Sequence, residues 1–220
     1  MHTPMESAKK IELSQWPRQQ HFEFYKNFSD PYFNICVELE AESLFNFSRL
    51  NNISFFNSYL YFAMKAANDI EPFAMRLVEG EVWLFEQINA NVVQLKEDET
   101  FRFSYLQQQD NFALFCQHTK QAIALAKSQP FFSEQFYSTG LACNCLHISV
   151  LPWLNFTSFS HASNHSEYSG IPKLVFGKYN KRTGIMPLSI EVHHALMDGI
   201  HVAQYVARLK HYFDNASKYI

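Results

Sequence analysis

The side chains best suited to chemistry lie close together near the C-terminus, in the segment 187–201, which reads PLSIEVHHALMDGIH. If this segment begins as a strand, alternation puts His194 at the end of an apolar stripe and His193 on the opposite face. Asp198 stands where an amphipathic helix begins, so it is suited to cap that helix. A neutral imidazole at the edge of an apolar face can take a proton from a hydroxyl, which makes His194 a candidate general base.

Two other interpretations of this segment stay open on its residues alone. In the first, His194 is a buried structural histidine and Asp198 only caps the helix. In the second, the two adjacent histidines, Asp198 and His201 together bind a metal ion, since all are residue types that ligate metals. Neighbouring histidines of a strand point to opposite faces, so these side chains converge poorly and no metal site is expected.

A mixture of helices and strands must position this segment. Alternating β-branched and aromatic residues predict strands over 32–39, 146–151, 173–178 and 187–193, with a hairpin over 74–85 that turns at Glu79 and Gly80. Apolar residues at helical spacing predict helices over 41–51, 54–69 and 107–127, and a last one from Gly199. This order indicates an α/β (α+β) fold with a partly antiparallel sheet. No long linker divides the chain, so a single domain over residues 1–220 is expected.

Composition excludes several classes of protein. The 220 residues carry 18 Lys and Arg against 21 Asp and Glu, a formal net charge of −3, whereas a nucleic-acid-binding protein would show a basic excess. Hydrophobic residues make up 47% and charged residues 18%, which excludes a disordered chain. The sequence shows neither the apolar stretch of a signal peptide nor a run long enough to span a membrane. We therefore expect a cytoplasmic protein whose four cysteines are buried thiols.

Further motifs accompany the pattern HHxxxDG at 193–199 and keep a fixed order along the chain. They are WPRQQHFEFY at 16–25, EPFAMRLVEGE at 71–81, SVLPWLNFTSF at 149–159, GKY at 177–179 and MPLSIEVHHALMDGIHV at 186–202. In order and spacing these segments resemble the chloramphenicol acetyltransferase family over nearly the whole chain. The resemblance implies a two-layer sandwich, in which a mixed, largely antiparallel sheet packs against helices, and a homotrimer with active sites between its subunits.

The resemblance also implies the reaction and the residues that perform it. Such enzymes pass acetyl directly from acetyl-coenzyme A to a hydroxyl of chloramphenicol, with no acyl-enzyme. His194 then matches the general base, with Nδ1 held by the carbonyl of the same residue, and Ser149 matches the donor to the oxyanion of the tetrahedral intermediate. Asp198 pairs with Arg18 in a buried salt bridge that shapes the site and does not relay protons.

Both substrates find candidate contacts through the same resemblance. A pocket lined by aromatic rings suits a small aromatic acceptor. Its expected lining is Phe24, Tyr25, Phe33, Phe103, Phe136, Phe159 and Val175. The expected contacts of coenzyme A are Trp153, Lys178 and Tyr179.

Two positions beside the acceptor depart from the family pattern. Val175 stands where the family has a threonine, so a hydroxyl that supports the tetrahedral intermediate is missing. Lys173 stands where the family has an apolar residue, and an inward ammonium needs either an acidic or phosphate group of a substrate or the solvent. The loop 158–164 also differs, so the same chemistry on a different hydroxylated acceptor stays open, as does a non-catalytic protein that sequesters an aromatic ligand or coenzyme A. The presence of both His194 and Ser149 argues against pure sequestration.

Overall fold

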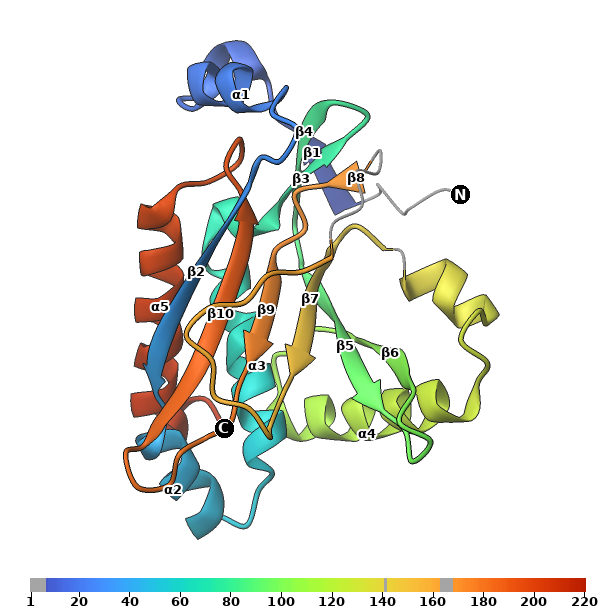
Figure 1. Cartoon of the computed structure of the whole chain (residues 1–220), viewed down its shortest axis with the longest axis vertical. Coiled ribbons are helices and arrows are strands. Elements are labelled where there is room, and N and C mark those ends of the chain that lie inside the picture. The colour runs from blue at the N-terminus through green and yellow to red at the C-terminus, as the bar shows by residue number, and fades with distance from the viewer. Residues whose placement is uncertain (1–6, 141, 163–167) are drawn as a thin grey trace.

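The computed structural model describes residues 7–140, 142–162 and 168–220. Its strands form two sheets, and helices pack against the larger one (Figure 1). The helices are α1 (Gln19–Tyr25), α2 (Glu42–Leu50), α3 (Phe55–Asn68), α4 (Phe112–Ser128) and α5 (Gly199–Asp214). The strands are β1 (Ala8–Lys10), β2 (Tyr32–Glu40), β3 (Met75–Val78), β4 (Glu81–Phe85), β5 (Asn89–Leu95), β6 (Phe101–Leu106), β7 (Cys145–Val150), β8 (Tyr168–Ser169), β9 (Lys173–Phe176) and β10 (Ile185–His193).

The larger sheet is mixed, with the strand order β2-β10-β9-β7-β5-β6. Strand β10 is antiparallel to both of its neighbours, β2 and β9, and β5 is antiparallel to β6. Strand β7 is parallel to β9 on one side and to β5 on the other. The smaller sheet, β1-β4-β3-β8, is antiparallel throughout and lies beyond the upper ends of β7 and β9 in Figure 1.

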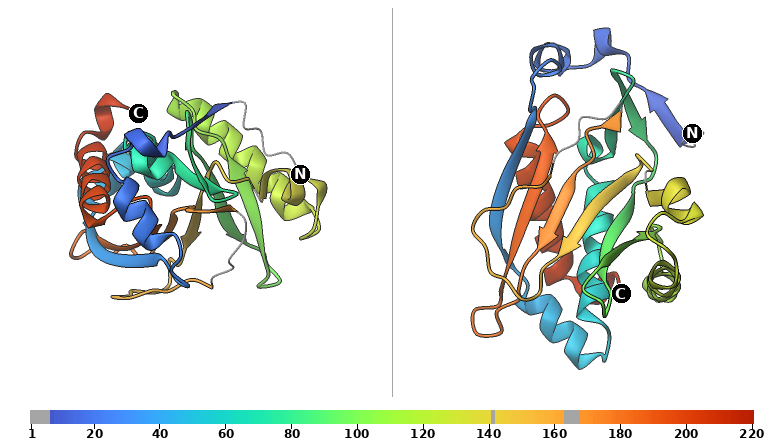
Figure 2. Two further views of the ribbon diagram at one scale, coloured as in Figure 1. Left: turned by 90° about the horizontal axis from the view of Figure 1, so that it is seen from above. Right: turned by 45° about the vertical axis from the view of Figure 1, so that its right-hand side comes forward.

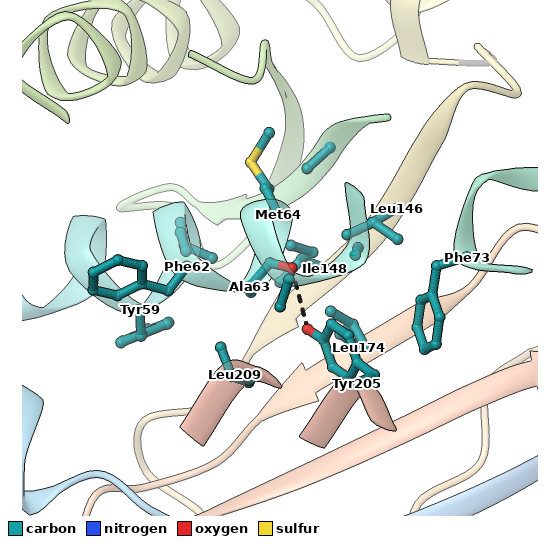
Figure 3. Close-up of a cluster of buried hydrophobic side chains, with 14 of the residues drawn as sticks. Tyr59, Phe62, Ala63, Met64, Phe73, Leu146, Ile148, Leu174, Tyr205 and Leu209 are labelled. Atoms are coloured by element: carbon teal, nitrogen blue, oxygen red, sulfur yellow. Dashed lines mark hydrogen bonds between the residues drawn. The ribbon is translucent and has the colours of Figure 1, made fainter. Parts of the chain in front are cut away.

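The hydrophobic core lies between the six-stranded sheet and the helices that cover one of its faces (Figure 2). Leu146 and Ile148 of β7 and Leu174 of β9 point into this core, where they are almost completely buried (Figure 3). Tyr205 of α5 donates its hydroxyl to the carbonyl oxygen of Ala63 in α3 at 3.3 Å, so even the polar atom of this buried ring is satisfied. The predicted α/β two-layer sandwich is confirmed.

The other face of the six-stranded sheet, called the outer face below, carries a different kind of covering. Segment 151–162, which follows β7, crosses in front of β10 and β9 (Figures 1 and 2). Because Leu146 and Ile148 face the core, alternation turns His147 and Ser149 to the outer face. The sheet therefore presents polar side chains on the side away from its helices.

Local signals explain where the helices begin. Ser54 caps α3 by accepting from the backbone N–H of Asn57 at 3.2 Å. Asn111 caps α4 in the same way, accepting from Leu114 N at 3.0 Å, so the helix predicted over 107–127 begins only at Phe112. None of the described helices is long and apolar enough to cross a membrane.

The hairpin prediction is confirmed, and four of the described strands were not predicted, namely β1, β5, β6 and β8. Glu79 and Gly80 both have positive φ, 52° and 79°, which is the geometry of a two-residue turn between antiparallel strands. Strands β5 and β6 were not predicted, although they form one edge of the larger sheet. Residues 163 and 164, at the end of the loop 158–164, lie outside the described residues.

Candidate active site

His194 directly follows β10, and its ring lies between two aromatic side chains. The ring stacks on Tyr25 of α1, with ring centroids 4.1 Å apart and planes inclined by 8°, and it meets Phe33 of β2 at 4.6 Å. The backbone N–H of His194 donates to Pro31 O at 2.8 Å, which ties it to the segment before β2. Packing thus fixes the imidazole while 31% of its side chain stays exposed.

Arg18 and Asp198 meet beside His194, although they stand near opposite ends of the sequence. Arg18 Nη1 contacts Asp198 Oδ2, and Arg18 Nη2 donates to the carbonyl oxygen of His194 at 3.0 Å. The hydrogen bond from Arg18 lowers the pKa of Asp198, so this carboxyl is ionised at neutral pH. The two side chains are 13% and 31% exposed, so the pair is half-buried where the sequence predicted a buried one.

The prediction for the ring nitrogen Nδ1 of His194 is wrong. The carbonyl of His194 accepts from Arg18, and Nδ1 instead faces Asp198, whose Oδ1 lies 3.0 Å away. Nδ1 is buried, and no described residue hydrogen-bonds it, so this contact lacks the alignment of a hydrogen bond. The physical reason is that a charged guanidinium is a stronger partner for the carbonyl than a neutral ring N–H. Asp198 consequently lies where it can stabilise positive charge on the imidazole.

The other two histidines of the motif have structural partners. His193 is 3% exposed, its Nδ1 accepts from Ala195 N at 3.2 Å, and burial lowers its pKa to about 4. His201 Nδ1 accepts from the backbone N–H of Asp198 at 2.9 Å and closes a capping box at the start of α5. Across the part of the chain that the structure describes, no three His, Cys, Asp or Glu side chains gather as a metal site requires.

Ser149 lies on the outer face far from His194 of the same chain. Its register partner on β9 is Val175, and the partner of Val175 on β10 is Ser189. His194 lies five residues beyond Ser189. At about 3.3 Å per residue and about 4.8 Å per strand, Ser149 and His194 are roughly 16 Å apart along the strands and roughly 10 Å apart across them. The fold therefore does not bring these two side chains of one chain together.

The predicted acceptor residues divide into two groups at opposite edges of the six-stranded sheet. Tyr25 and Phe33 contact His194, and the exposed Phe24 packs against Tyr25 with ring centroids 4.9 Å apart. Phe103 belongs to β6, at the other edge, and its ring meets that of Phe136 at 6.2 Å. One acceptor molecule of ordinary size cannot touch both groups in one chain.

The second group of acceptor residues shares a level of the sheet with Ser149. Phe103 is the register partner of Val93 in β5, and the preceding Val92 pairs with Ile148 of β7. Phe103 and Ser149 thus stand two strands apart on the same face. Val175, which is fully buried beside Ser149, also belongs to this group. Phe159 lies in the crossing segment over the outer face, where its ring meets that of His161 at 4.9 Å.

The predicted coenzyme A residues follow β7 and β9, at the end of both strands. Trp153 is 60% exposed, and Lys178 donates its backbone N–H to Leu154 O at 2.8 Å, which joins the two segments. The ring of Tyr179 turns towards the helices and packs on Phe45, with ring centroids 4.6 Å apart. A cavity of about 740 Å³ lies at this end of the molecule. Its lining is Cys36, Val37, Glu38, Asn155, Phe156, Thr157, Asn180, Thr183, Ile185 and Pro187.

Lys173 has a partner that the sequence analysis did not identify. Its Nζ lies 2.7 Å from Glu191 Oε1 and 5.3 Å from the centre of the Tyr32 ring, and only 17% of the lysine side chain is exposed. The prediction that the Lys173 ammonium meets an acidic or phosphate group of a substrate, or the solvent, is therefore wrong. Its partner is Glu191, which is its register partner on the same face of the sheet. Alternation along 187–193 puts Glu191 on this face, but the pairing of β10 with β9 cannot be read from one strand alone.

Comparison with known proteins places the chain among acetyltransferases. The family model described as "Chloramphenicol acetyltransferase" matches residues 7–210. The chloramphenicol acetyltransferase of Proteus mirabilis is 27% identical over 212 residues, which are 94% of this chain and 95% of the relative, and that of Escherichia coli is 26% identical over 208 residues, 93% of each. A solved structure named chloramphenicol acetyltransferase superimposes with a TM-score of 0.83 at 25% identity, covering 94% of this chain and 99% of the other.

Proposed function

Since the chain belongs to the chloramphenicol acetyltransferase family, whose members are acetyltransferases, we propose that it transfers acetyl from acetyl-coenzyme A to a hydroxyl of chloramphenicol or of a similar small aromatic acceptor. The observation that carries the proposal is the setting of His194. Its ring is fixed by stacking on Tyr25, is partly exposed, and has the carboxylate of Asp198 beside Nδ1. A general base needs this combination of a fixed, accessible ring and a stabilised charged form.

In the proposed mechanism His194 acts through its other ring nitrogen. Nε2 takes the proton of the acceptor hydroxyl while the hydroxyl oxygen attacks the thioester carbonyl carbon, and that carbonyl oxygen becomes an oxyanion. Ser149 donates a hydrogen bond to the oxyanion, a contribution of about 2.7–4 kcal/mol to the barrier in comparable sites. The carbon–sulfur bond then breaks, and the leaving sulfur takes the proton back from His194, which returns the imidazole to its neutral form.

The distance between Ser149 and His194 supports a site shared by two copies of the chain. A reacting carbonyl must lie within about 3 Å of both the base-bound hydroxyl and the oxyanion donor, and the register separates these side chains by several times that distance. We therefore define two half-sites on neighbouring copies, which fits the proposed homotrimer. The His194 half-site is Arg18, Phe24, Tyr25, Phe33, His194 and Asp198. The Ser149 half-site is Phe103, Phe136, Ser149, Phe159 and Val175.

Coenzyme A is proposed to approach the Ser149 half-site from the carboxyl ends of β7 and β9. The exposed indole of Trp153 offers a flat apolar surface, and the Lys178 ammonium suits a phosphate. Tyr179 is held by its packing on Phe45, so it contributes from a fixed position.

Release of the coenzyme A thiol from acetyl-coenzyme A tests the proposal. Release that depends on chloramphenicol supports it, whereas release with other hydroxylated aromatics but not with chloramphenicol supports the same chemistry on another acceptor. Binding of either substrate with no release supports the sequestering protein. A single domain over residues 1–220 and a cytoplasmic location remain part of the proposal.

A further inference from the structure

A row of polar side chains crosses the outer face of the six-stranded sheet. Each member is the register partner of the next, so the row takes one residue from every strand. Its members, in strand order, are Asn34, Glu191, Lys173, His147, Asn91 and Tyr105. Polar side chains at one level of all six strands are unusual in a sheet whose opposite face packs mainly apolar side chains into the core, because each polar group must find a partner.

The centre of this polar row is enclosed and has no net charge. Lys173 and Glu191 form an ion pair at 2.7 Å, with 17% and 7% of their side chains exposed, so their charges cancel. Burial lowers the pKa of His147 to about 4, which leaves this ring neutral at pH 7. The row therefore offers hydrogen-bond donors and acceptors together, without favouring an anion or a cation.

A second polar group faces the polar row from the crossing segment. His161 lies close enough to Lys173 and Glu191 to interact electrostatically with both. Burial lowers the pKa of His161, so this ring is also neutral at pH 7. Its Nε2 atom is buried, and no residue in the described part of the chain hydrogen-bonds it. A buried nitrogen without a hydrogen bond is destabilising, so this atom is suited to bind a polar group of a ligand.

The polar row lies next to the proposed position of the reacting carbonyl. His147 precedes Ser149 by two residues on the same face, a separation of about 6.6 Å. Lys173 stands in the same relation to Val175 on β9. The expected coenzyme A contacts follow Ser149 in the chain, so acetyl-coenzyme A approaches from the carboxyl ends of β7 and β9. The acceptor must then extend over the amino-terminal ends of these strands, where the polar row lies.

We propose that the polar row binds the acceptor, and that the preferred acceptor is an uncharged molecule with an aromatic ring next to several hydroxyl groups, of the kind found in an aryl glycoside. The inference rests on the proposed function and names its substrate class. Phe103 and Phe136 supply the apolar wall for the ring, at the edge of the sheet where the row ends in Tyr105. Hydroxyls suit Lys173, Glu191 and His161 because a hydroxyl both donates and accepts.

The test compares phenyl β-D-glucopyranoside with chloramphenicol as acceptors, by thiol release and by calorimetric binding. The wild-type protein is expected to bind the glucoside and to acetylate it with a kcat/KM at least equal to that for chloramphenicol. The double variant Lys173→Met/Glu191→Gln removes both charges together, so no buried charge is left unpaired. It should lower the ratio of the two kcat/KM values, glucoside over chloramphenicol, about tenfold or more. The matched control, Lys210→Met/Glu40→Gln, removes an exposed ion pair of 2.6 Å between α5 and β2 and should leave the ratio unchanged.

The outcomes separate this inference from the proposed function. Chloramphenicol-dependent release with no binding of the glucoside, or an unchanged ratio in the folded double variant, overturns the inference and leaves the acetyltransferase in place. No release with any acceptor overturns the proposed function, and the calorimetry then still decides whether the row binds the glucoside. If the double variant does not fold, the wild-type protein is tested with a second acceptor, 2-phenylethanol, which has an aromatic ring and one hydroxyl. Its kcat/KM should be about tenfold lower than that of the glucoside. Equal use of the two overturns the inference.

Discussion

The His194 half-site and the Ser149 half-site are built from the sequence in opposite ways. At the first, residues of two short motifs meet directly: Arg18 contacts Asp198 and also holds the carbonyl of His194. At the second, residues from β6, β7 and β9 share only their level in the sheet, as with Ser149 and Val175. The position of His194 is therefore determined by direct side-chain contacts. The positions of the groups proposed to meet the oxyanion and the acceptor are determined by strand register alone.

The largest effect is expected from the half-site with direct contacts. His194→Ala should lower the rate of acetyl transfer by about 10²–10⁴-fold or more, because it removes the proposed general base. Thiol release measures the rate, and calorimetry should show that coenzyme A still binds. The control is His118→Ala, at an exposed position of α4, which should change neither quantity. Near-normal turnover of His194→Ala would reject the role of this histidine.

Ser149→Ala should lower the rate by about 10²–10³-fold, the effect of one lost oxyanion donor. The comparison becomes sharper when the two inactive variants are expressed together. If the half-sites belong to neighbouring copies, some interfaces combine an intact His194 with an intact Ser149, and random mixing should restore about a quarter of the sites. The chain that carries both substitutions, expressed with itself, is the control. Mixed oligomers that stay inactive would place both half-sites in a single chain and contradict the register argument.

Much of the His194 half-site could be predicted from the sequence, and the reason is local. The alternation of 187–193 placed His194 and His193 on opposite sides, and the motif comparison brought Arg18 to Asp198. The sequence could not show that Arg18 and the His194 ring compete for the carbonyl oxygen of His194. Arg18 binds this oxygen, and Nδ1 of His194 is left facing Asp198. That choice depends on distances of about an ångström, which no residue pattern carries.

At the Ser149 half-site the sequence predicted residues but not their grouping. Phe33 and Phe103 were expected in one pocket, yet they lie on β2 and β6, at opposite edges of the sheet. The division within one chain could not be foreseen because strands β5 and β6 were not predicted, and without them the level shared by Phe103 and Ser149 cannot be seen. The partner of Lys173 escaped for the same reason, because Glu191 becomes its neighbour only through the pairing of β9 with β10.

A stability measurement probes how the His194 half-site is held. Arg18→Met should lower the free energy of unfolding by about 1.5–3 kcal/mol, the range for hydrogen bonds to charged groups. It should also lower activity, because the carbonyl of His194 loses its partner. Thermal unfolding at a fixed protein concentration provides the measurement. Lys26→Met is the control, since it breaks an exposed pair with Glu23 at 2.5 Å and should change stability by well under about 1 kcal/mol. Equal effects of the two substitutions would mean that the Arg18 pair is only a surface contact.

The pH dependence of stability should expose the buried histidine beside the His194 half-site. His193 has its pKa lowered from 6.5 to about 4 by burial, so between these pH values the unfolded chain binds a proton that the folded chain does not. Stability is therefore complete above pH 6.5 and falls as the pH drops towards 4, by about 1–2 kcal/mol between pH 7 and pH 5. His193→Asn keeps an acceptor for Ala195 N and should flatten this slope in thermal unfolding, whereas the exposed His118→Asn should not. A slope unchanged by His193→Asn would assign the acid sensitivity to another group.

The smallest effect concerns the Ser149 half-site, where Val175 lies beside Ser149 with no exposed surface. Val175→Thr adds a hydroxyl of nearly the same shape at the level of the proposed oxyanion, and one added hydrogen bond contributes about 0.5–1.5 kcal/mol. We therefore expect kcat with chloramphenicol to rise between about twofold and tenfold. Val206→Thr, which adds a hydroxyl on α5, away from both half-sites, is the matched control and should leave kcat unchanged. The opposite result is an unchanged kcat in Val175→Thr together with a raised kcat in Lys173→Met/Glu191→Gln. It would mean that the rate is limited by acceptor binding over the polar row and not by the hydroxyl that is missing at Val175.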